Sequence, residues 1–98
     1  MTYRLIIRPE AEAELAEAFD WYEHHAPGLG GDFLFAFDAV LSSVLNNPLL
    51  HPALYRGIRR ALLRRFPYQV LFLPEEDVIT VIAVFHGARD PRRWQDRI

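Results

Sequence analysis

The chain contains no cysteine and no lysine, and only one of its 98 residues is methionine. Without cysteine it has neither a disulfide framework nor a thiolate metal site, which is compatible with a reducing compartment. No apolar run approaches the roughly 20 residues of a membrane-spanning helix, and the run at 3–7 is too short for the core of a signal peptide. We therefore expect a soluble, cytoplasmic protein that does not associate with membranes.

Motifs for several common catalytic chemistries are also missing. The sequence has no phosphate-binding glycine loop, no H-E-x-x-H pattern and no G-x-S-x-G elbow. The glycine-rich stretch 28–31 lacks the preceding strand that a phosphate loop requires, so it predicts a turn. His24 and His25 are adjacent and would point in different directions on a helix, while His51 lies in a proline-flanked loop. We expect no metal ion and no cofactor.

The sequence predicts one domain covering residues 1–98, because a chain of this length with 51% hydrophobic residues can bury a modest core. The net charge is -2, but acidic and basic residues are unevenly distributed along the chain. Residues 1–49 contain two arginines and eight acids, whereas residues 50–98 contain nine arginines and five acids. The planar guanidinium suits bidentate contact with carboxylate or phosphate, although genomic bias explains the missing lysines about equally well. The positions of the arginines are therefore more informative than their identity.

Hydrophobic periodicity predicts a first strand at 3–7 and then two helices. Pro9 suits the first turn of the first helix, and a histidine-, proline- and glycine-containing break at 24–28 ends it. Asp32 is expected to cap a second helix that starts at Phe33 and stops at 46–48. Because the connection is short, the helices should form an antiparallel hairpin. The apolar face of the first helix is formed by Leu15, Ala18, Phe19 and Tyr22.

Three strands are expected after the helices, at 58–65, 68–73 and 78–85, with a hairpin turn at 74–77. The last two are almost uniformly apolar and should form the centre of the sheet. The strand at 58–65 carries charge on both faces and should lie near an edge. The predicted fold is α+β: a strand, a two-helix antiparallel hairpin and a three-stranded antiparallel meander, forming one sheet packed by the helices.

His86 is the most informative titratable residue. It ends the last predicted strand, and Gly87 turns the chain so that Arg89 comes close. Alternation puts His86 on the same face as Val78, Thr80, Ile82 and Val84. Cleavage of RNA through its 2′-hydroxyl needs a base, an acid and cations for the phosphorane, so His86 and Arg89 are candidate catalytic residues if the protein is a ribonuclease. The alternative is that His86 fixes the C-terminal turn by a hydrogen bond to the backbone.

Arginines from two segments are expected to converge beside His86 on an electropositive surface that docks a polyanion or an acidic protein segment. The alternative is that they are solvated charges that protect a sheet edge from aggregation. We predict that target binding involves these arginines and two aromatic residues: Arg59, Arg60, Arg64, Arg65, Tyr68, Arg92, Arg93 and Trp94.

Several weak motifs together resemble the RelE/ParE toxin superfamily of bacterial type II toxin–antitoxin systems, over nearly the whole chain. The resemblance implies a small α+β toxin that a cognate antitoxin wraps and neutralises in a hetero-oligomer. It also implies a target, which is DNA gyrase for ParE-like members or ribosome-bound mRNA for RelE-like members. The motifs are Pro27-Gly28-Leu29-Gly30 with Phe33, Asn47-Pro48, Arg59-Arg60, Phe66-Pro67-Tyr68 and His86-x-x-Arg89-x-Pro91-x-x-Trp94.

Two positions depart from the pattern of the superfamily's nucleases. Gln69 stands where those nucleases commonly place an arginine, and Trp94 stands where they place a late tyrosine or histidine. Glutamine offers no fixed positive charge to a phosphorane. The resemblance therefore favours a ParE-like, plasmid-stabilization type of toxin that interferes with gyrase and breaks no bond itself. A RelE-like ribosome-dependent endoribonuclease is the enzyme alternative, and a decayed member that only binds antitoxin is a third.

Overall fold

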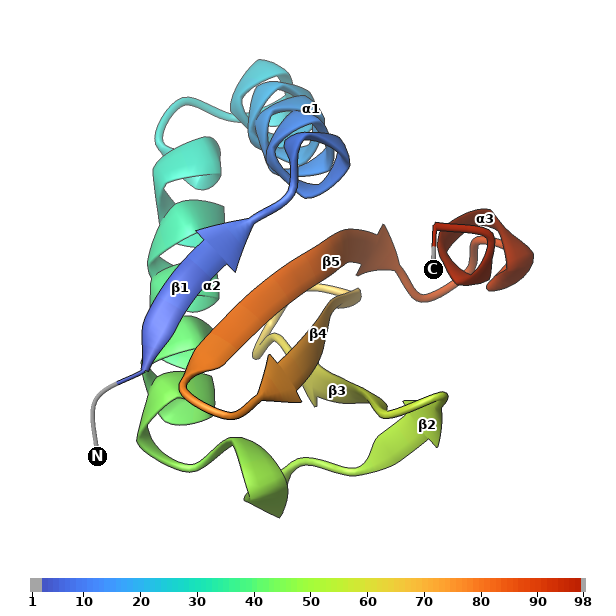
Figure 1. The fold of residues 1–98 in the computed structure, drawn as a ribbon. Helices are drawn as coiled ribbons and strands as arrows, with labels where there is room; N and C mark the ends of the chain where they lie inside the picture. The colour runs from blue at the N-terminus through green and yellow to red at the C-terminus, as the bar shows by residue number, and fades with distance from the viewer. Residues whose placement is uncertain (1–2, 98) are drawn as a thin grey trace.

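The computed structural model describes residues 3–97 and has a five-stranded sheet with two long helices, α1 and α2, packed on one side (Figure 1). A short C-terminal helix, α3, lies on the other side, against the apolar residues of that sheet face. This arrangement confirms the predicted α+β class. The elements are β1 (Arg4–Ile7), α1 (Pro9–His25), α2 (Leu29–Asn46), the 3₁₀ turn η1 (Pro48–Leu50), β2 (Ala53–Tyr55), β3 (Ile58–Leu62), β4 (Tyr68–Glu75), β5 (Val78–His86) and α3 (Arg92–Gln95).

The strand order is β1-β5-β4-β3-β2, so β4 and β5 lie inside the sheet as predicted. β1 pairs in parallel with β5, with Arg4 opposite Val78, and the other pairs are antiparallel. The two helices begin the crossover connection that a parallel pair requires, because they carry the chain over one face of the sheet. The chain then returns through β2, β3 and β4 to β5.

Two details of the sheet were wrong in the prediction. β3 ends at Leu62 and not at residue 65, because the chain turns there and Arg65 has a φ of 74°, which no strand accommodates. β2 was not expected, since three residues are too few to give a periodic pattern. It forms a hairpin with β3 through Arg56 and Gly57, whose φ values of 48° and 81° are those of a two-residue type I′ turn.

The connection between the helices differs from the predicted cap. α2 begins at Leu29, directly after Gly28 at a φ of 87°, so Asp32 lies within the first turn of α2. The cap comes from α1: the Glu23 carboxylate accepts hydrogen bonds from the backbone N–H groups of Gly28 and Gly30, each at 3.0 Å. A Cβ at Gly30 would lie 2.8 Å from the Phe19 ring, so only glycine lets the helices approach this closely.

A β-bulge in β5 decides which side chains face α1. Leu71 pairs with Ala83 and Phe72 with Val81, which leaves Ile82 as an extra residue. The bulge shifts the alternation, so Ile82 packs on the α3 side while Val84 packs on the helix side. The predicted single face running from Val78 through Ile82 to His86 is therefore wrong.

Apolar side chains are buried on both faces of the sheet. The helix side contains Phe33, Phe37, Phe66, Val70 and Val84, and the α3 side contains Ile58, Leu71, Ile82, Phe85 and Trp94. Because β4 and β5 contribute to both clusters, their continuous apolar sequences follow from burial on both sides.

Candidate functional site

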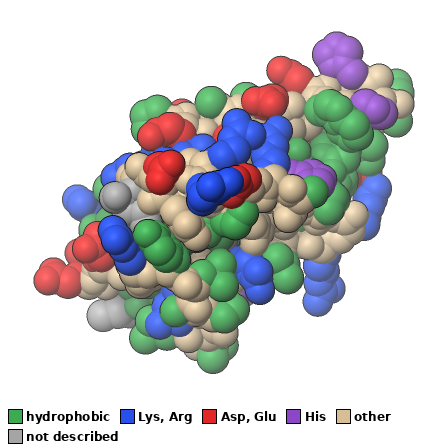
Figure 2. Space-filling view, turned by 90° about the vertical axis from the view of Figure 1, so that its right-hand side faces the viewer, with side chains coloured by type: hydrophobic (Ala, Val, Ile, Leu, Met, Phe, Trp, Pro, Cys, Tyr) green, Lys and Arg blue, Asp and Glu red, His purple; other side chains and the backbone are tan. Residues whose placement is uncertain are grey.

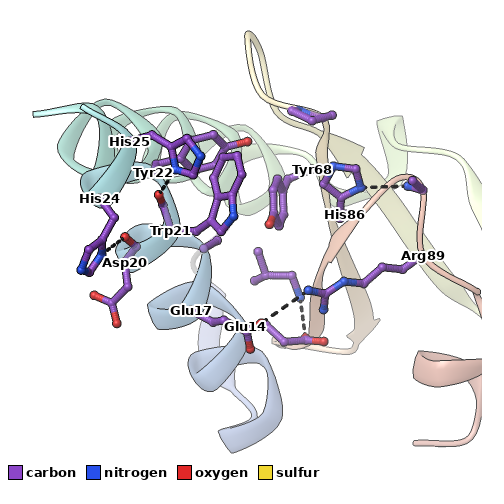
Figure 3. A pocket seen from close by; sticks show the side chains of 14 residues that line it. Glu14, Glu17, Asp20, Trp21, Tyr22, His24, His25, Tyr68, His86 and Arg89 are labelled. Atoms are coloured by element: carbon purple, nitrogen blue, oxygen red, sulfur yellow. Dashed lines mark hydrogen bonds and ion pairs between the residues drawn. The ribbon is translucent and has the colours of Figure 1, made fainter. Parts of the chain in front are cut away.

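A cleft of about 710 Å³ lies between the C-terminal half of α1 and the adjoining ends of β4 and β5. We call it the His86 cleft and define it by Trp21, Tyr68, His86 and Arg89, with Glu14, Glu17 and Asp20 also in its lining. Figure 3 shows Trp21 on one wall, Tyr68 and His86 facing it, and Arg89 extending toward Glu17. The two predicted catalytic candidates and Tyr68 therefore meet at one site.

The bulge and the end of β5 place His86. Tyr68 and His86 are opposite each other in the β4–β5 ladder, and their rings meet edge to face at a centroid distance of 5.2 Å. The backbone N–H of Ala88 donates to Nδ1 of His86 at 3.0 Å. A neutral imidazole that accepts at Nδ1 carries its proton on Nε2, so it presents a hydrogen-bond donor as its second ring nitrogen.

Arg89 is the only arginine that lines the cleft among residues 3–97. Its Nη2 lies 3.5 Å from Oε1 of Glu17, and the two side chains are 33% and 70% exposed. Glu17, Glu14 and Asp20 line the α1 wall at intervals of three residues, which places them on neighbouring turns of the helix. The cleft therefore combines one guanidinium and aromatic rings with a carboxylate-bearing wall.

Glu14 and Arg97 form a nearly buried clamp behind the cleft. Nη1 and Nη2 of Arg97 lie 2.9 and 2.8 Å from the two Glu14 oxygens, and the side chains are 16% and 12% exposed. Glu14 also accepts the backbone N–H of Val84 at 3.1 Å, while Arg97 donates to the carbonyl of Ile82 at 3.1 Å. The clamp thus binds backbone groups of β5 that lie beyond Val81, the last β5 residue opposite β1, and it fixes the C-terminal segment that carries Arg89.

Burial raises the pKa of Tyr68 above the ordinary tyrosine value of 10.0; Arg89 opposes the shift and Glu17 adds to it. Burial also raises the pKa of Tyr22, with a further contribution from Tyr68. Both phenols are therefore held in their neutral form.

The raised pKa values predict a loss of stability in alkali. The unfolded chain releases these phenolic protons near pH 10.0, before the folded protein does, so the stabilisation is complete below this pH and declines as pH rises through the folded values. Denaturant titrations across this range should show a falling free energy of unfolding, and Tyr68→Phe should reduce the decline. An identical decline in Tyr68→Phe would contradict the assignment to Tyr68.

The other predicted arginines do not join Arg89. Arg59 and Arg60 point to opposite faces of β3 because they are adjacent in a strand. Arg59 donates to the carbonyl of His51 at 2.6 Å, Arg64 and Arg65 line a separate groove beside α2, and Arg92 pairs with Asp90 at 2.7 Å. On the face drawn in Figure 2 several arginine groups lie close together beside carboxylates near the upper middle, while the others are spread toward the edges. Arg93 lies in α3 and is not in the lining of the cleft. The expectation of one basic patch converging on His86 is therefore corrected.

Trp94 also lies elsewhere than expected. It is only 2% exposed and packs in the cluster on the α3 side, with its ring 5.9 Å from Tyr55. The helix α3, which was not predicted, turns this side chain inward. Trp94 is therefore a core residue and does not offer an exposed ring for target binding.

The sequence reasoning did not place Trp21, Glu14 or Arg97 at this site. Trp21 is 56% exposed and stacks on His25 at 3.7 Å, and Nδ1–H of His25 donates to the carbonyl of Trp21. A large aromatic residue off the predicted apolar face of the first helix was the available signal for Trp21. No sequence signal paired Glu14 with Arg97, which are 83 residues apart.

The comparisons with known proteins agree with this fold. The profile of a family described as "ParE toxin of type II toxin-antitoxin system, parDE" matches residues 5–91. The chain is 33% identical to Toxin ParE2 of Mycobacterium tuberculosis (strain CDC 1551 / Oshkosh), in an alignment that covers 100% of this chain and 94% of that protein. The same values hold for Toxin ParE2 of strain ATCC 25618 / H37Rv.

Two solved structures share the fold. A chain from the chromosomal ParDE TA system of P. aeruginosa gives a TM-score of 0.76 at 17% identity, covering 87% of this chain and 96% of that one. A mutant of E. coli toxin RelE in the free state gives a TM-score of 0.64 at 16% identity, covering 99% and 94%. Fold and sequence thus define a type II toxin of the RelE/ParE superfamily. Within it, the chain belongs to the ParE toxin family.

Proposed function

We propose that this toxin interferes with DNA gyrase by binding it, and that the His86 cleft is the contact surface. The observation that carries the proposal is the hydrogen bond from the Ala88 N–H to Nδ1 of His86. With Nδ1 occupied and the proton on Nε2, the neutral ring has no free lone pair to act as a general base. His86 is instead suited to donate a hydrogen bond to an acceptor on a protein partner.

The electrostatics of the cleft support binding without cleavage. A phosphorane needs convergent positive charge, whereas the cleft offers Arg89 beside Glu17 and Asp20. Gln69 cannot assist, because it follows Tyr68 in β4 and pairs with Phe85 on the α3 side of the sheet. A protein segment that presents both donors and acceptors matches this lining better than a phosphate backbone does.

A ribosome-dependent endoribonuclease is the second candidate, because His86, Arg89 and Tyr68 do meet in one cleft. The two activities separate in a paired assay, in which purified toxin is added to supercoiling by DNA gyrase and to mRNA on translating ribosomes. We expect inhibition of supercoiling and intact mRNA. Cut mRNA with normal supercoiling would reverse the ranking, and normal growth on expression without antitoxin would favour a decayed antitoxin-binding protein.

Arg89→Ala and His86→Ala should each relieve growth arrest while changing the free energy of unfolding by less than about 1 kcal/mol, because both side chains are at the surface of the cleft. The matched control is Arg92→Ala, whose side chain is 81% exposed and pairs with Asp90 outside the cleft. It should arrest growth like the unmodified toxin. If the cleft variants unfold, or remain fully toxic, the cleft is structural.

The family implies an antitoxin partner. We propose that the cognate antitoxin forms a hetero-oligomer with this toxin in the cytoplasm and covers its target-binding surface. High salt should weaken the complex if antitoxin carboxylates contact the toxin's arginines.

A further inference from the structure

A continuous row of aromatic rings runs through the His86 cleft, from the end of α1 to the adjoining ends of β4 and β5. Trp21 meets Tyr22 edge to face at a centroid distance of 5.0 Å, and Tyr22 lies 6.1 Å from Tyr68. Tyr68 in turn lies 5.2 Å from His86. These separations are those of favourable aromatic pairs, so the cleft presents π surface on both of its walls (Figure 3).

Trp21 is the ring of this row that offers most of its surface to a partner. It is 56% exposed, whereas Tyr22 is 9% exposed. His25 stacks on one face of the indole at 3.7 Å, and its Nδ1–H donates to the carbonyl of Trp21 at 2.7 Å. The indole is therefore held in place before a partner arrives, which lowers the entropic cost of binding to it.

Glu17 supplies negative charge beside the indole. Its ion pair with Arg89 is long, at 3.5 Å, and the Glu17 side chain is 70% exposed. A strong charge-assisted hydrogen bond spans about 2.7–2.9 Å, so this pair leaves the carboxylate largely available to a second cation. Glu14 is not available in this way, because both of its oxygens accept from Arg97. Figure 3 shows Glu17 below Trp21, on the same side of α1.

The charge of the cleft favours a cation over an anion. Two guanidiniums, those of Arg89 in the lining and Arg97 behind it, oppose three carboxylates, so the cleft stays negative while its histidines are neutral. Aromatic faces attract cations, and tryptophan does so most strongly. A nucleobase could also stack on an indole, but its phosphates would meet the carboxylates. The three carboxylates are those of Glu14, Glu17 and Asp20.

We propose that the α1 wall of the His86 cleft binds a basic side chain of the target protein, an arginine, between Trp21 and Glu17. A guanidinium can lay its planar face on the indole while its N–H groups donate to the carboxylate. Arg89 and the Nε2–H of His86 then remain for acceptors on the same segment. The inference rests on the proposed binding function and defines the partner segment as one that carries a basic residue beside hydrogen-bond acceptors.

The first test compares Nα-acetylarginine amide with Nα-acetylcitrulline amide, which has nearly the same shape and no charge. NMR follows binding through the indole N–H of Trp21, which Trp21→Ala identifies among the two tryptophans of the chain. The arginine amide should bind at least about fivefold more tightly. Glu17→Gln should remove most of this difference. The matched control is Glu12→Gln, because Glu12 is exposed on the same helix but lies outside the cleft, and it should retain the difference.

Circular dichroism establishes that each variant is folded before titration. Equal binding of the two amides, or an unchanged difference in Glu17→Gln, would overturn the proposal. So would binding of single-stranded oligothymidine at Trp21 that is tighter than binding of the arginine amide, because the cleft would then select a nucleic acid.

A supercoiling assay separates this inference from the proposed target. Trp21→Ala should inhibit DNA gyrase at least about tenfold less well than the unmodified toxin. Phe35→Ala should inhibit it equally well, since that ring is 78% exposed outside the cleft. Full inhibition by Trp21→Ala would overturn the cation site and leave gyrase as the target. Gyrase that is unaffected by the unmodified toxin, while the arginine amide binds at Trp21, would overturn the target alone.

Discussion

Replacing Arg97 with alanine is expected to lower the free energy of unfolding by about 3–5 kcal/mol, because it leaves a nearly buried carboxylate without its counter-ion. Glu14 is 12% exposed, and after the substitution the Val84 N–H is the one remaining hydrogen-bond donor to it among the contacts of residues 3–97. The carbonyl of Ile82, which lies beyond the last residue paired with β1, would also lose its Arg97 donor. The loss should appear as a lower midpoint in urea denaturation.

A double-mutant cycle with Glu14→Ala shows whether the two groups act as a unit. The double variant should be much less destabilised than the sum of the single variants, because removing both partners leaves no unpaired charge. Arg92→Ala is the control for loss of an arginine: its ion pair is short, at 2.7 Å, but exposed, so stability should be unchanged within error. Additive effects of the Glu14 and Arg97 substitutions would contradict the clamp.

Replacing Phe33 with alanine is expected to cost about 3–5 kcal/mol as well, because the ring is fully buried and its loss opens a cavity. Phe33 lies at the centre of an aromatic cluster, with ring centroids 5.3 Å from Tyr22, 5.4 Å from Phe66 and 5.2 Å from Tyr68. Since Tyr68 lines the His86 cleft, the substitution should also disturb the cleft. Thermal and chemical denaturation measure the first effect.

Phe35→Ala provides the matched control, two residues away on the same helix. Its ring is 78% exposed, so the free energy of unfolding should change by no more than about 0.5 kcal/mol. Similar losses from the two substitutions would mean that α2 does not present Phe33 to the sheet and Phe35 to solvent.

Most of the fold was predicted from hydrophobic periodicity, because the spacing of apolar residues indicates which side chains are buried. The alternation and apolar runs of 68–73 and 78–85 located the sheet centre, and the 3.6-residue pattern located both helices. The start of α2 was predicted too late in the sequence, because Gly28 takes a positive φ and the helix begins directly after it. β2 was not predicted, because its pairing depends on the turn at Arg56 and Gly57 more than on its own three residues.

The candidate site was predictable where it depends on the adjoining ends of β4 and β5, which carry Tyr68 and His86. His86 and Arg89 are three residues apart in one turn, so their proximity follows from local sequence. The prediction of one basic patch was wrong for two reasons. Neighbouring residues of β3 face opposite sides of the sheet, and some arginines form ion pairs with acids from distant segments, as Arg65 does with Asp32. The bulge at Ile82 puts the Val84 side chain on the same side of the sheet as α1. It depends on how β5 pairs with β4, and the hydrophobic pattern of the sequence does not predict it.

The most direct test of a binding cleft is the inhibition of purified DNA gyrase by the unmodified toxin, Arg89→Ala and Arg92→Ala at matched concentrations. The cleft predicts that the unmodified toxin and Arg92→Ala block supercoiling equally, and that Arg89→Ala is weaker by at least about tenfold. Supercoiling that proceeds normally with all three proteins, while the unmodified toxin cuts mRNA on ribosomes, would contradict it.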